Sequence, residues 1–208
     1  MGFSPEGVKL ITAAIAVAAA GGALSYWFKW VGVGVLLLGF GAAAFSAYFL
    51  RDPERNREFA PGEIACPADG TVMSVGAEDD PGVTVVRIFL SIFNVHIQRA
   101  PATAKVTDVK YSKGDFAIAY KPEAAKNERN RISFCDASGR KFAVEQLTGS
   151  IARRIACYVK PGQEVKASQK IGMIYFGSQV AVYLPAGSRV LVKPGDKVAG
   201  GETVLGLW

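Results

Sequence analysis

Apolar residues are distributed very unevenly along this chain of 208 residues. Between residues 10 and 50 the only charged side chain is Lys29, which separates two apolar runs, Leu10–Phe28 and Trp30–Leu50. Each run has about the 20 residues that a helix needs to cross the hydrocarbon core of a bilayer. We therefore predict that residues 1–50 form a membrane anchor, an N-terminal transmembrane helical hairpin.

The residues that flank the two runs support a membrane location. Aromatic side chains, which favour the membrane interface, lie near the ends of the runs: Tyr26, Trp27, Trp30 and Tyr48. Arg51, Arg55 and Arg57 follow the second run, and by the positive-inside rule they place residues 51–208 on the cytoplasmic side of the cell (inner) membrane. A cleaved signal peptide fits less well, because the apolar stretch is too long. A shallow hairpin in one leaflet and a buried helical hairpin of a soluble protein are the alternatives.

The pattern changes to short β-branched runs from Ile64 onward. Val83–Leu90 and Ile151–Val159 are typical of strands. Turns are expected at the glycines between such runs, namely Gly70, Gly82, Gly114 and Gly139. Only Phe116–Asn130 looks helical or looped, and Pro122 limits any helix there. Residues 51–208 are therefore predicted to form a mainly β domain.

One internal repeat is visible in this β region. The segment Val159–Val165, VKPGQEV, resembles Val192–Val198, VKPGDKV, and Pro67–Val72 has a similar strand–turn–strand character. Repeated turns of this kind are typical of biotinyl and lipoyl carrier domains, although the hairpin that presents their lysine does not occur in this sequence. We expect a β-barrel or β-sandwich with internal duplication and biotinyl/lipoyl-like elements.

Composition excludes several classes of protein. The net charge of +6 suits an anionic lipid surface, and the sequence shows no basic helix, zinc spacing or RNA-binding signature that would indicate nucleic acid. Cys66, Cys135 and Cys157 have no C-x-x-C spacing and are typical of small buried thiols in a reducing compartment. The single histidine, His96, rules out a three-histidine zinc site, and we expect no metal.

Two short segments could carry chemistry. His96 lies in Val95-His-Ile-Gln-Arg, but a lone histidine is more often structural, and a serine hydrolase would also need G-x-S-x-G. Gly177-Ser178 follows an apolar run. A serine after glycine in a strained turn can attack the preceding carbonyl, because glycine has no side chain to block the approach. Elimination from the resulting ester would leave a dehydroalanine, which hydrolyses to ammonia and a pyruvoyl group, provided that a base lies near the serine.

Six motifs, in order, resemble the phosphatidylserine decarboxylase family, in its short, membrane-anchored prokaryotic form. They are Arg51-Asp-Pro-Glu-Arg, Ala68-Asp-Gly-Thr-Val, Val95-His-Ile-Gln-Arg-Ala-Pro, Asn127-Glu-Arg-Asn, Ile151-Ala-Arg-Arg-Ile and Phe176-Gly-Ser-Gln-Val. Each motif is weak alone, but six in the same order are specific. The resemblance spans about residues 45–185.

The resemblance implies a zymogen that cuts itself between Gly177 and Ser178. Ser178 becomes the pyruvoyl group, and the catalytic domain, residues 51–208, is divided into 51–177 and 178–208, which stay together as a heterodimer. His96 resembles the catalytic histidine, and Asp69 the acid that orients a histidine during self-cleavage. Some relatives carry a second histidine where this chain has Arg99, so His96 is left as the only imidazole for both tasks.

The implied activity is that of a pyruvoyl-dependent lyase of phospholipid biosynthesis. The amine of phosphatidylserine forms a Schiff base with the pyruvoyl group, which takes up the electrons left by CO2 as pyridoxal phosphate would. Hydrolysis then releases phosphatidylethanolamine. His96, with an ordinary pKa near ~6.5, is the candidate proton donor. Arg99, Arg153 and Arg154 are candidates for binding the lipid phosphate, although structural roles suit them equally well.

Three other functions compete with this interpretation. A related serine lipid, such as an archaetidylserine-like substrate, would require the same headgroup chemistry. A non-enzymatic membrane adaptor with a lipoyl-like domain would have no need for Asp69, His96 and Gly177-Ser178 together. A soluble pyruvoyl amino-acid decarboxylase is disfavoured by the apolar segments. Homo-oligomerisation is left open by the sequence.

Overall fold

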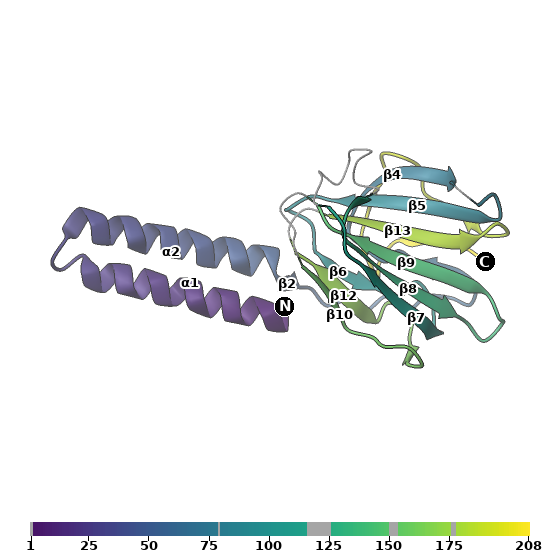
Figure 1. The fold of residues 1–208 in the computed structure, drawn as a ribbon, viewed down its shortest axis with the longest axis horizontal. Helices are drawn as coiled ribbons and strands as arrows, with labels where there is room; N and C mark the ends of the chain where they lie inside the picture. The colour runs from purple at the N-terminus through teal and green to yellow at the C-terminus, as the bar shows by residue number, and fades with distance from the viewer. Residues whose placement is uncertain (1, 79, 116–125, 150–153, 176–177) are drawn as a thin grey trace. The chain divides into compact units, whose positions relative to one another are not determined.

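The computed structural model describes residues 2–78, 80–115, 126–149, 154–175 and 178–208. The chain divides into two compact units, Met1–Glu54 and Arg55–Trp208 (Figure 1). The first unit contains the two helices, and the second contains the β-strands from β3 onward.

The first unit is a helical hairpin, as its apolar runs predict. Helix α1 covers Pro5–Leu24 and helix α2 covers Lys29–Phe49, and a short β1 (Gly2–Phe3) pairs with β2 (Arg51–Asp52). Ser4 caps α1, because its Oγ accepts a hydrogen bond from the Gly7 amide at 3.1 Å. Both helices are long and apolar enough to span a bilayer.

Small residues let the two helices of this hairpin approach closely. A Cβ added to Gly21 would collide with the backbone of Leu36, and one added to Gly39 with the backbone of Ala18. Large apolar side chains instead lie exposed on the outside of the hairpin, among them Leu37, Leu38 and Phe40. Such a surface is stable in lipid and unfavourable in water.

The second unit is built almost wholly from strands. They are β3 (Glu63–Ala65), β4 (Gly70–Ala77), β5 (Val83–Leu90), β6 (Ile97–Arg99), β7 (Ala104–Ser112), β8 (Arg129–Cys135), β9 (Lys141–Leu147), β10 (Ile155–Cys157), β11 (Glu164–Val165), β12 (Lys170–Ile174), β13 (Ser178–Pro185), β14 (Arg189–Val190), β15 (Lys197–Val198) and β16 (Val204–Leu207). The prediction of a mainly β domain is confirmed.

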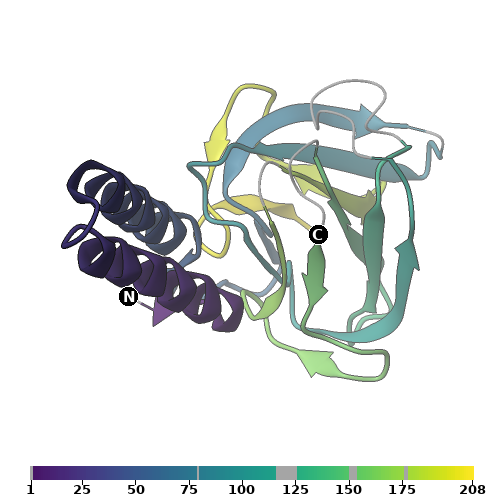
Figure 2. The same cartoon turned by 60° about the vertical axis from the view of Figure 1, so that its left-hand side comes forward.

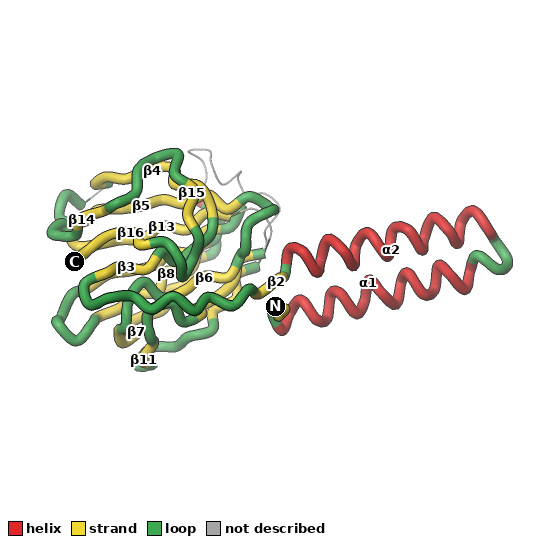
Figure 3. The backbone as a smooth tube through the Cα atoms, turned by 180° about the vertical axis from the view of Figure 1, so that it is seen from behind, coloured by secondary structure: helices red, strands yellow, loops and turns green. Residues whose placement is uncertain are grey.

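Eight of these strands form one large antiparallel sheet in the order β11-β7-β8-β9-β13-β5-β4-β15. The sheet curls into a half-barrel, which Figure 2 shows from the side. Two three-stranded sheets complete the unit, β10-β12-β6 and β14-β16-β3. Seen from behind, β3, β14 and β16 lie on the face of the large sheet that Figure 1 hides (Figure 3).

The core lies between the large sheet and these smaller sheets. Val144, Val182 and Ile88 come from the large sheet, and Ile64 and Leu205 from β3 and β16. All five are fully buried. Burial of such aliphatic side chains is the main term that stabilises a domain of this size.

The two VKPG segments occupy opposite edges of the large sheet. In the first, the Gly162 amide donates to the Val106 carbonyl at 2.8 Å; in the second, the Gly195 amide donates to the Val72 carbonyl at 2.9 Å. The short strands that follow, β11 and β15, pair with β7 and β4 respectively. The repeat seen in the sequence therefore makes the same turn and the same edge contact twice.

Several local predictions were wrong in detail. Gly70 is the first residue of β4 and not a turn. The strand predicted over Ile151–Val159 is confined to β10, and 151–153 lie outside the described residues. Arg154 lies immediately before β10.

The three cysteines also differ from the expectation that all are buried. All three are free thiols, but Cys157 is exposed and Cys135 is half-buried. Cys66 is fully buried, and this burial raises the pKa of its thiol to about 12. Since the thiolate is the reactive form, Cys66 is an inert core residue.

Candidate active site

Ser178 is the first residue of β13, the strand between β9 and β5 in the large sheet. Its register partner on β5 is Leu90, and both side chains are fully buried. The Ser178 hydroxyl has no hydrogen-bond partner among the described residues. A buried hydroxyl without a partner costs free energy, and at Ser178 this cost falls on the Gly177-Ser178 step that the sequence singles out. This environment fits a serine that is converted into a carbonyl-containing group.

His96 lies between β5 and β6, six residues after Leu90. Its ring Nδ1 is 2.9 Å from the Asn94 carbonyl oxygen. A carbonyl oxygen can only accept, so Nδ1 must carry the proton and the neutral ring presents the lone pair of Nε2. The turn before it is rigid, because Asn94 Oδ1 accepts from both the amide and the hydroxyl of Ser91.

The segment that leads into Ser178 is held from both sides by backbone hydrogen bonds. On one side the Ile174 amide donates to the His96 carbonyl at 3.1 Å; on the other the Tyr175 amide donates to the Arg154 carbonyl at 3.1 Å. Ile174 and Tyr175 lie four and three residues before Ser178 in the sequence. The three-stranded sheet β10-β12-β6 thus places His96 and Arg154 on opposite sides of this segment.

Asp69 lies immediately before β4 and is half-buried. Its Oδ1 accepts from the Gly200 amide at 2.8 Å, and its Oδ2 lies 3.1 Å from Nη2 of Arg55. Arg55 belongs to the Arg51-Asp-Pro-Glu-Arg motif. The carboxylate of Asp69 is therefore held in one orientation by a backbone amide and a cation. The order of the motifs in the sequence did not indicate the contact between Asp69 and Arg55.

The arginines predicted to bind substrate occupy different environments. Arg99 is buried, and its Nη1 donates to the Ser168 carbonyl at 2.9 Å. Arg154 is exposed beside Tyr175. Arg153 and Gly177 lie outside the described residues.

Sequence reasoning assigned no role to the buried amide side chains near the site, although Gln98, Asn127 and Asn130 lie within the family motifs. They are Gln98, Asn130 and Gln146, and a further amide, Asn127, donates to the Thr148 carbonyl at 2.7 Å. Each of the first three lies on a strand and has one apolar residue two positions away on the same face, namely Ala100, Ile132 and Val144 respectively. Polar residues at inward positions of otherwise apolar strands were the available signal.

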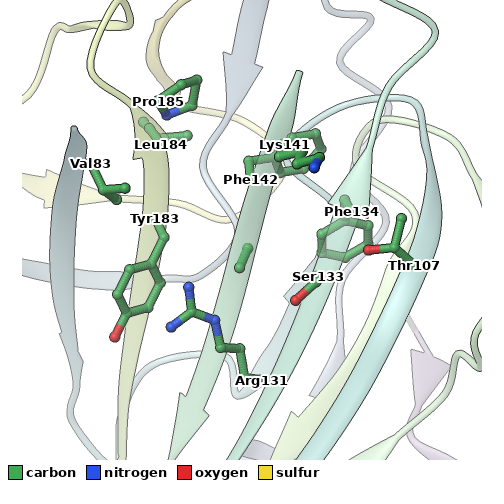
Figure 4. A pocket seen from close by; sticks show the side chains of 11 residues that line it. Val83, Thr107, Arg131, Ser133, Phe134, Lys141, Phe142, Tyr183, Leu184 and Pro185 are labelled. Atoms are coloured by element: carbon green, nitrogen blue, oxygen red, sulfur yellow. The ribbon is translucent and has the colours of Figure 1, made fainter. Parts of the chain in front are cut away.

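Two pockets among the described residues are lined mainly by side chains of the large sheet. One, of about 440 Å³, is lined by side chains that include Arg131, Phe142 and Tyr183 (Figure 4). Arg131 covers the ring of Tyr183 at 4.0 Å, and the Tyr183 hydroxyl donates to Glu145 at 3.2 Å. Burial and the Glu145 carboxylate raise the pKa of Tyr183. No predicted site residue lines this pocket, so it is distinct from the candidate site.

Comparison with known proteins points to one family. Residues 42–206 match the family model described as phosphatidylserine decarboxylase. A phosphatidylserine decarboxylase proenzyme of Saccharopolyspora erythraea is 42% identical over 186 residues, which cover 85% of this chain and 78% of that protein. Proteins of the same name from Burkholderia ambifaria and Desulfotalea psychrophila are 41% and 39% identical; the matches cover 77% and 79% of this chain and 78% and 80% of those proteins.

Proposed function

We propose a residue-level account of catalysis for this chain, which belongs to the phosphatidylserine decarboxylase family and is therefore the proenzyme of a pyruvoyl-dependent carboxy-lyase. In this proposal Ser178 is the pyruvoyl precursor and the chain is cut between Gly177 and Ser178. The observation that carries it is the buried hydroxyl of Ser178, which has no hydrogen-bond partner among the described residues. Family membership excludes the non-enzymatic adaptor considered above.

Self-cleavage follows from the position of this hydroxyl. The Ser178 Oγ attacks the carbonyl carbon of Gly177, the peptide C–N bond breaks, and the acyl group moves from nitrogen to oxygen. Removal of the Cα proton of Ser178 then expels the Gly177 carboxylate, and hydrolysis of the dehydroalanine releases ammonia. Burial favours these steps, because water that could hydrolyse the ester early is excluded.

His96 is the proposed base and acid. With the proton of its ring on Nδ1, Nε2 can accept the Ser178 hydroxyl proton during self-cleavage. A pyruvoyl group at Ser178 supplies the electron-withdrawing carbonyl that stabilises charge as CO2 departs. His96 returns a proton to the substrate carbon. Asp69 is proposed as the acid that supports the self-cleavage step, in line with the family resemblance.

We assign substrate binding to arginines near the segment that leads to Ser178. Arg154 is exposed and its backbone holds Tyr175, so its guanidinium is available beside the segment that leads to Ser178. We propose that Arg154, together with Arg153, binds the lipid phosphate by charge-assisted hydrogen bonds. Arg99 donates to the Ser168 carbonyl, and we propose a supporting role for it instead.

The sheet topology explains how the two products stay together. The short chain, 178–208, begins with β13, which lies between β9 and β5 in the middle of the large sheet. It pairs with Val83–Leu90 along its whole length and with five residues of β9. A central strand cannot leave without loss of both ladders and of the core, so we propose a permanent heterodimer of the two chains.

Three further features belong to this proposal. The apolar hairpin crosses the membrane and keeps residues 51–208 on the cytoplasmic side, as Arg51, Arg55 and Arg57 predict. The equivalent edge turns at Gly162 and Gly195 support an internal duplication with lipoyl-like elements. The substrate in this proposal, phosphatidylserine, is a lipid of the same membrane.

Replacement of Ser178 tests the assignment directly. Ser178→Ala should give one uncut chain with no decarboxylase activity that folds normally, since only one hydroxyl is lost. Ser188→Ala is a matched control, because the Ser188 hydroxyl is also buried without a hydrogen-bond partner among the described residues. It should be cut and active. Decarboxylation of phosphatidylserine by Ser178→Ala would place the pyruvoyl group elsewhere.

A further inference from the structure

Three buried amide side chains form a continuous hydrogen-bonded relay that ends on the backbone of His96. Asn130 Nδ2 donates to Gln146 Oε1 at 2.9 Å, and Gln146 Nε2 donates to Gln98 Oε1 at 2.8 Å. Gln98 Nε2 then donates to the His96 carbonyl at 2.7 Å. Gln98 and Gln146 are fully buried, and Asn130 nearly so.

The His96 carbonyl fixes the direction of this relay. A carbonyl oxygen only accepts, so Gln98 must turn its NH2 group toward His96 and its oxygen toward Gln146. Gln146 must then present its NH2 to Gln98 and its oxygen to Asn130. Hydrogen bonds aligned in one direction polarise and strengthen one another, so the relay is a single ordered unit.

The relay joins the two sheets that carry the proposed catalytic residues. Asn130 and Gln146 belong to the large sheet, where Gln146 is the register partner of Val180, two residues beyond Ser178 on the same strand face. Gln98 belongs to β6, which follows His96 directly. The Gln146–Gln98 hydrogen bond therefore links β9, which pairs with the strand of Ser178, to β6, the strand that follows His96.

Gly172 leaves room for this crossing. It is the register partner of Gln98 on β12, and a Cβ placed there would lie 2.6 Å from Gln146 Nε2. A side chain larger than hydrogen at position 172 would displace the Gln146 amide. The space left by Gly172 and the hydrogen bonds of the three amides thus favour the same arrangement of these side chains. Apolar residues in their place would not fix one arrangement in this way.

We propose that Asn130, Gln146 and Gln98 are positioning residues that set the distance and orientation of His96 relative to Ser178. This inference rests on the proposed roles of these two residues. The His96 carbonyl accepts from both Gln98 and the Ile174 amide. Two donors on one carbonyl hold its peptide plane, and with it the start of the imidazole side chain. Proton transfer requires this precision, because a displacement of about 1 Å can slow a reaction about 10²-fold.

Gln98→Met tests the relay with a side chain of nearly the same shape. The full chain, synthesised in detergent, should fold but cut itself about 10- to 100-fold more slowly than the wild type, as followed by time-resolved gels. In the fraction that has matured, kcat should fall while KM for phosphatidylserine stays within about twofold. Glu145→Gln is the control: Glu145 is also buried and precedes Gln146 on β9, so its side chain lies on the opposite face of the strand. It should be cut at the wild-type rate.

Gln98→Glu provides a readout that a loss of stability alone would not produce. A neutral glutamic acid can donate to the His96 carbonyl as the amide does, whereas a carboxylate cannot and would repel it. Burial raises the pKa of such a carboxyl above its ordinary ~4.3. The rate of self-cleavage relative to wild type should therefore be near one at pH 5 and fall at least tenfold by pH 8. The relative rate of Glu145→Gln should stay flat with pH.

The outcomes separate this proposal from the proposed function. Wild-type protein cut before Ser178, with Gln98→Met and Gln98→Glu maturing at the wild-type rate at every pH, would overturn the relay and leave the function intact. Wild-type protein that is not cut before Ser178 would overturn the function itself. If Gln98→Met fails to fold, the pH dependence of Gln98→Glu still decides between positioning and a purely structural role.

Discussion

His96, the only histidine of the chain, is assigned two proton transfers, one in self-cleavage and one in decarboxylation. His96→Ala should therefore impair both steps, while Asp69→Asn should mainly slow self-cleavage. A positioned acid or base contributes ~10²–10⁴-fold in rate, so slow cutting of His96→Ala over days is expected. Time-resolved gels measure cutting, and release of labelled CO2 measures turnover per matured chain.

A variant of Arg55 serves as the control for Asp69→Asn. Asparagine keeps the oxygen that accepts from Gly200 but loses the charge that pairs with Arg55. Arg55→Gln removes the same ion pair and leaves the carboxylate in place. Slower cutting in Asp69→Asn but not in Arg55→Gln would indicate a direct role for the carboxylate. Normal cutting in His96→Ala would mean that another group is the base for serine attack.

At the level of residues, the sequence was informative where chemistry is concentrated in a short motif. Ser178, His96 and Asp69 were nominated as site residues in this way. The relay could not be found, because Gln98 and Gln146 are 48 positions apart and neither lies in a motif that includes the other. The Arg55–Asp69 pair, 14 positions apart, was hidden for the same reason. Only the fold brings such side chains into contact.

The two equivalent edge turns are the elements that depend most on glycine. Gly162 and Gly195 have φ values of 86° and 93°, in the left-handed region. Alanine at either position should cost about 1–2 kcal/mol, which lowers Tm by about 2–8 °C for a domain of this size. Thermal melting of the full chain in detergent measures the shift.

Gly187→Ala is the matched control for these turns. Gly187 lies in a turn without a positive φ, and a Cβ there meets nothing within 4 Å. It should leave Tm unchanged or slightly higher, because the unfolded chain loses entropy. A large Tm decrease in Gly187→Ala, or none in Gly162→Ala and Gly195→Ala, would contradict the equivalence of the two turns.

Strands were predicted well where β-branched residues run without interruption, as in Val83–Leu90, which matches β5 from end to end. The short strands were harder to predict from the sequence. β10 has three residues, and it is held by pairing with β12 rather than by its own sequence. Pairing partners of two- and three-residue strands depend on contacts distant in sequence, which local propensity does not report.

At the scale of the whole molecule, the first unit should serve only to anchor the chain, and the second unit should carry out self-cleavage without it. The proposed catalytic residues all lie within Arg55–Trp208, a unit with its own core. Deletion of residues 1–50 should release the protein into the soluble fraction and leave self-cleavage intact. Centrifugation after a carbonate wash, followed by gels, measures both. Full-length protein in the soluble fraction would show that the apolar hairpin does not anchor the chain.

The sequence predicted this division and the class of each part, but not the arrangement of the β unit. Forty nearly uncharged residues predict two helices from composition alone. The strand order β11-β7-β8-β9-β13-β5-β4-β15 follows from pairing between distant segments, such as β13 with both β5 and β9. That central position of β13 makes cleavage at its first residue compatible with a stable product.

The intact mass of the purified protein tests the central claim most directly. We predict two chains, residues 1–177 and residues 178–208, with the shorter chain blocked at its N-terminus by a pyruvoyl group. Treatment with hydroxylamine or borohydride should shift the mass of the shorter chain alone, because only it carries a reactive ketone. An active sample that consists of one uncut chain of 208 residues would contradict the account.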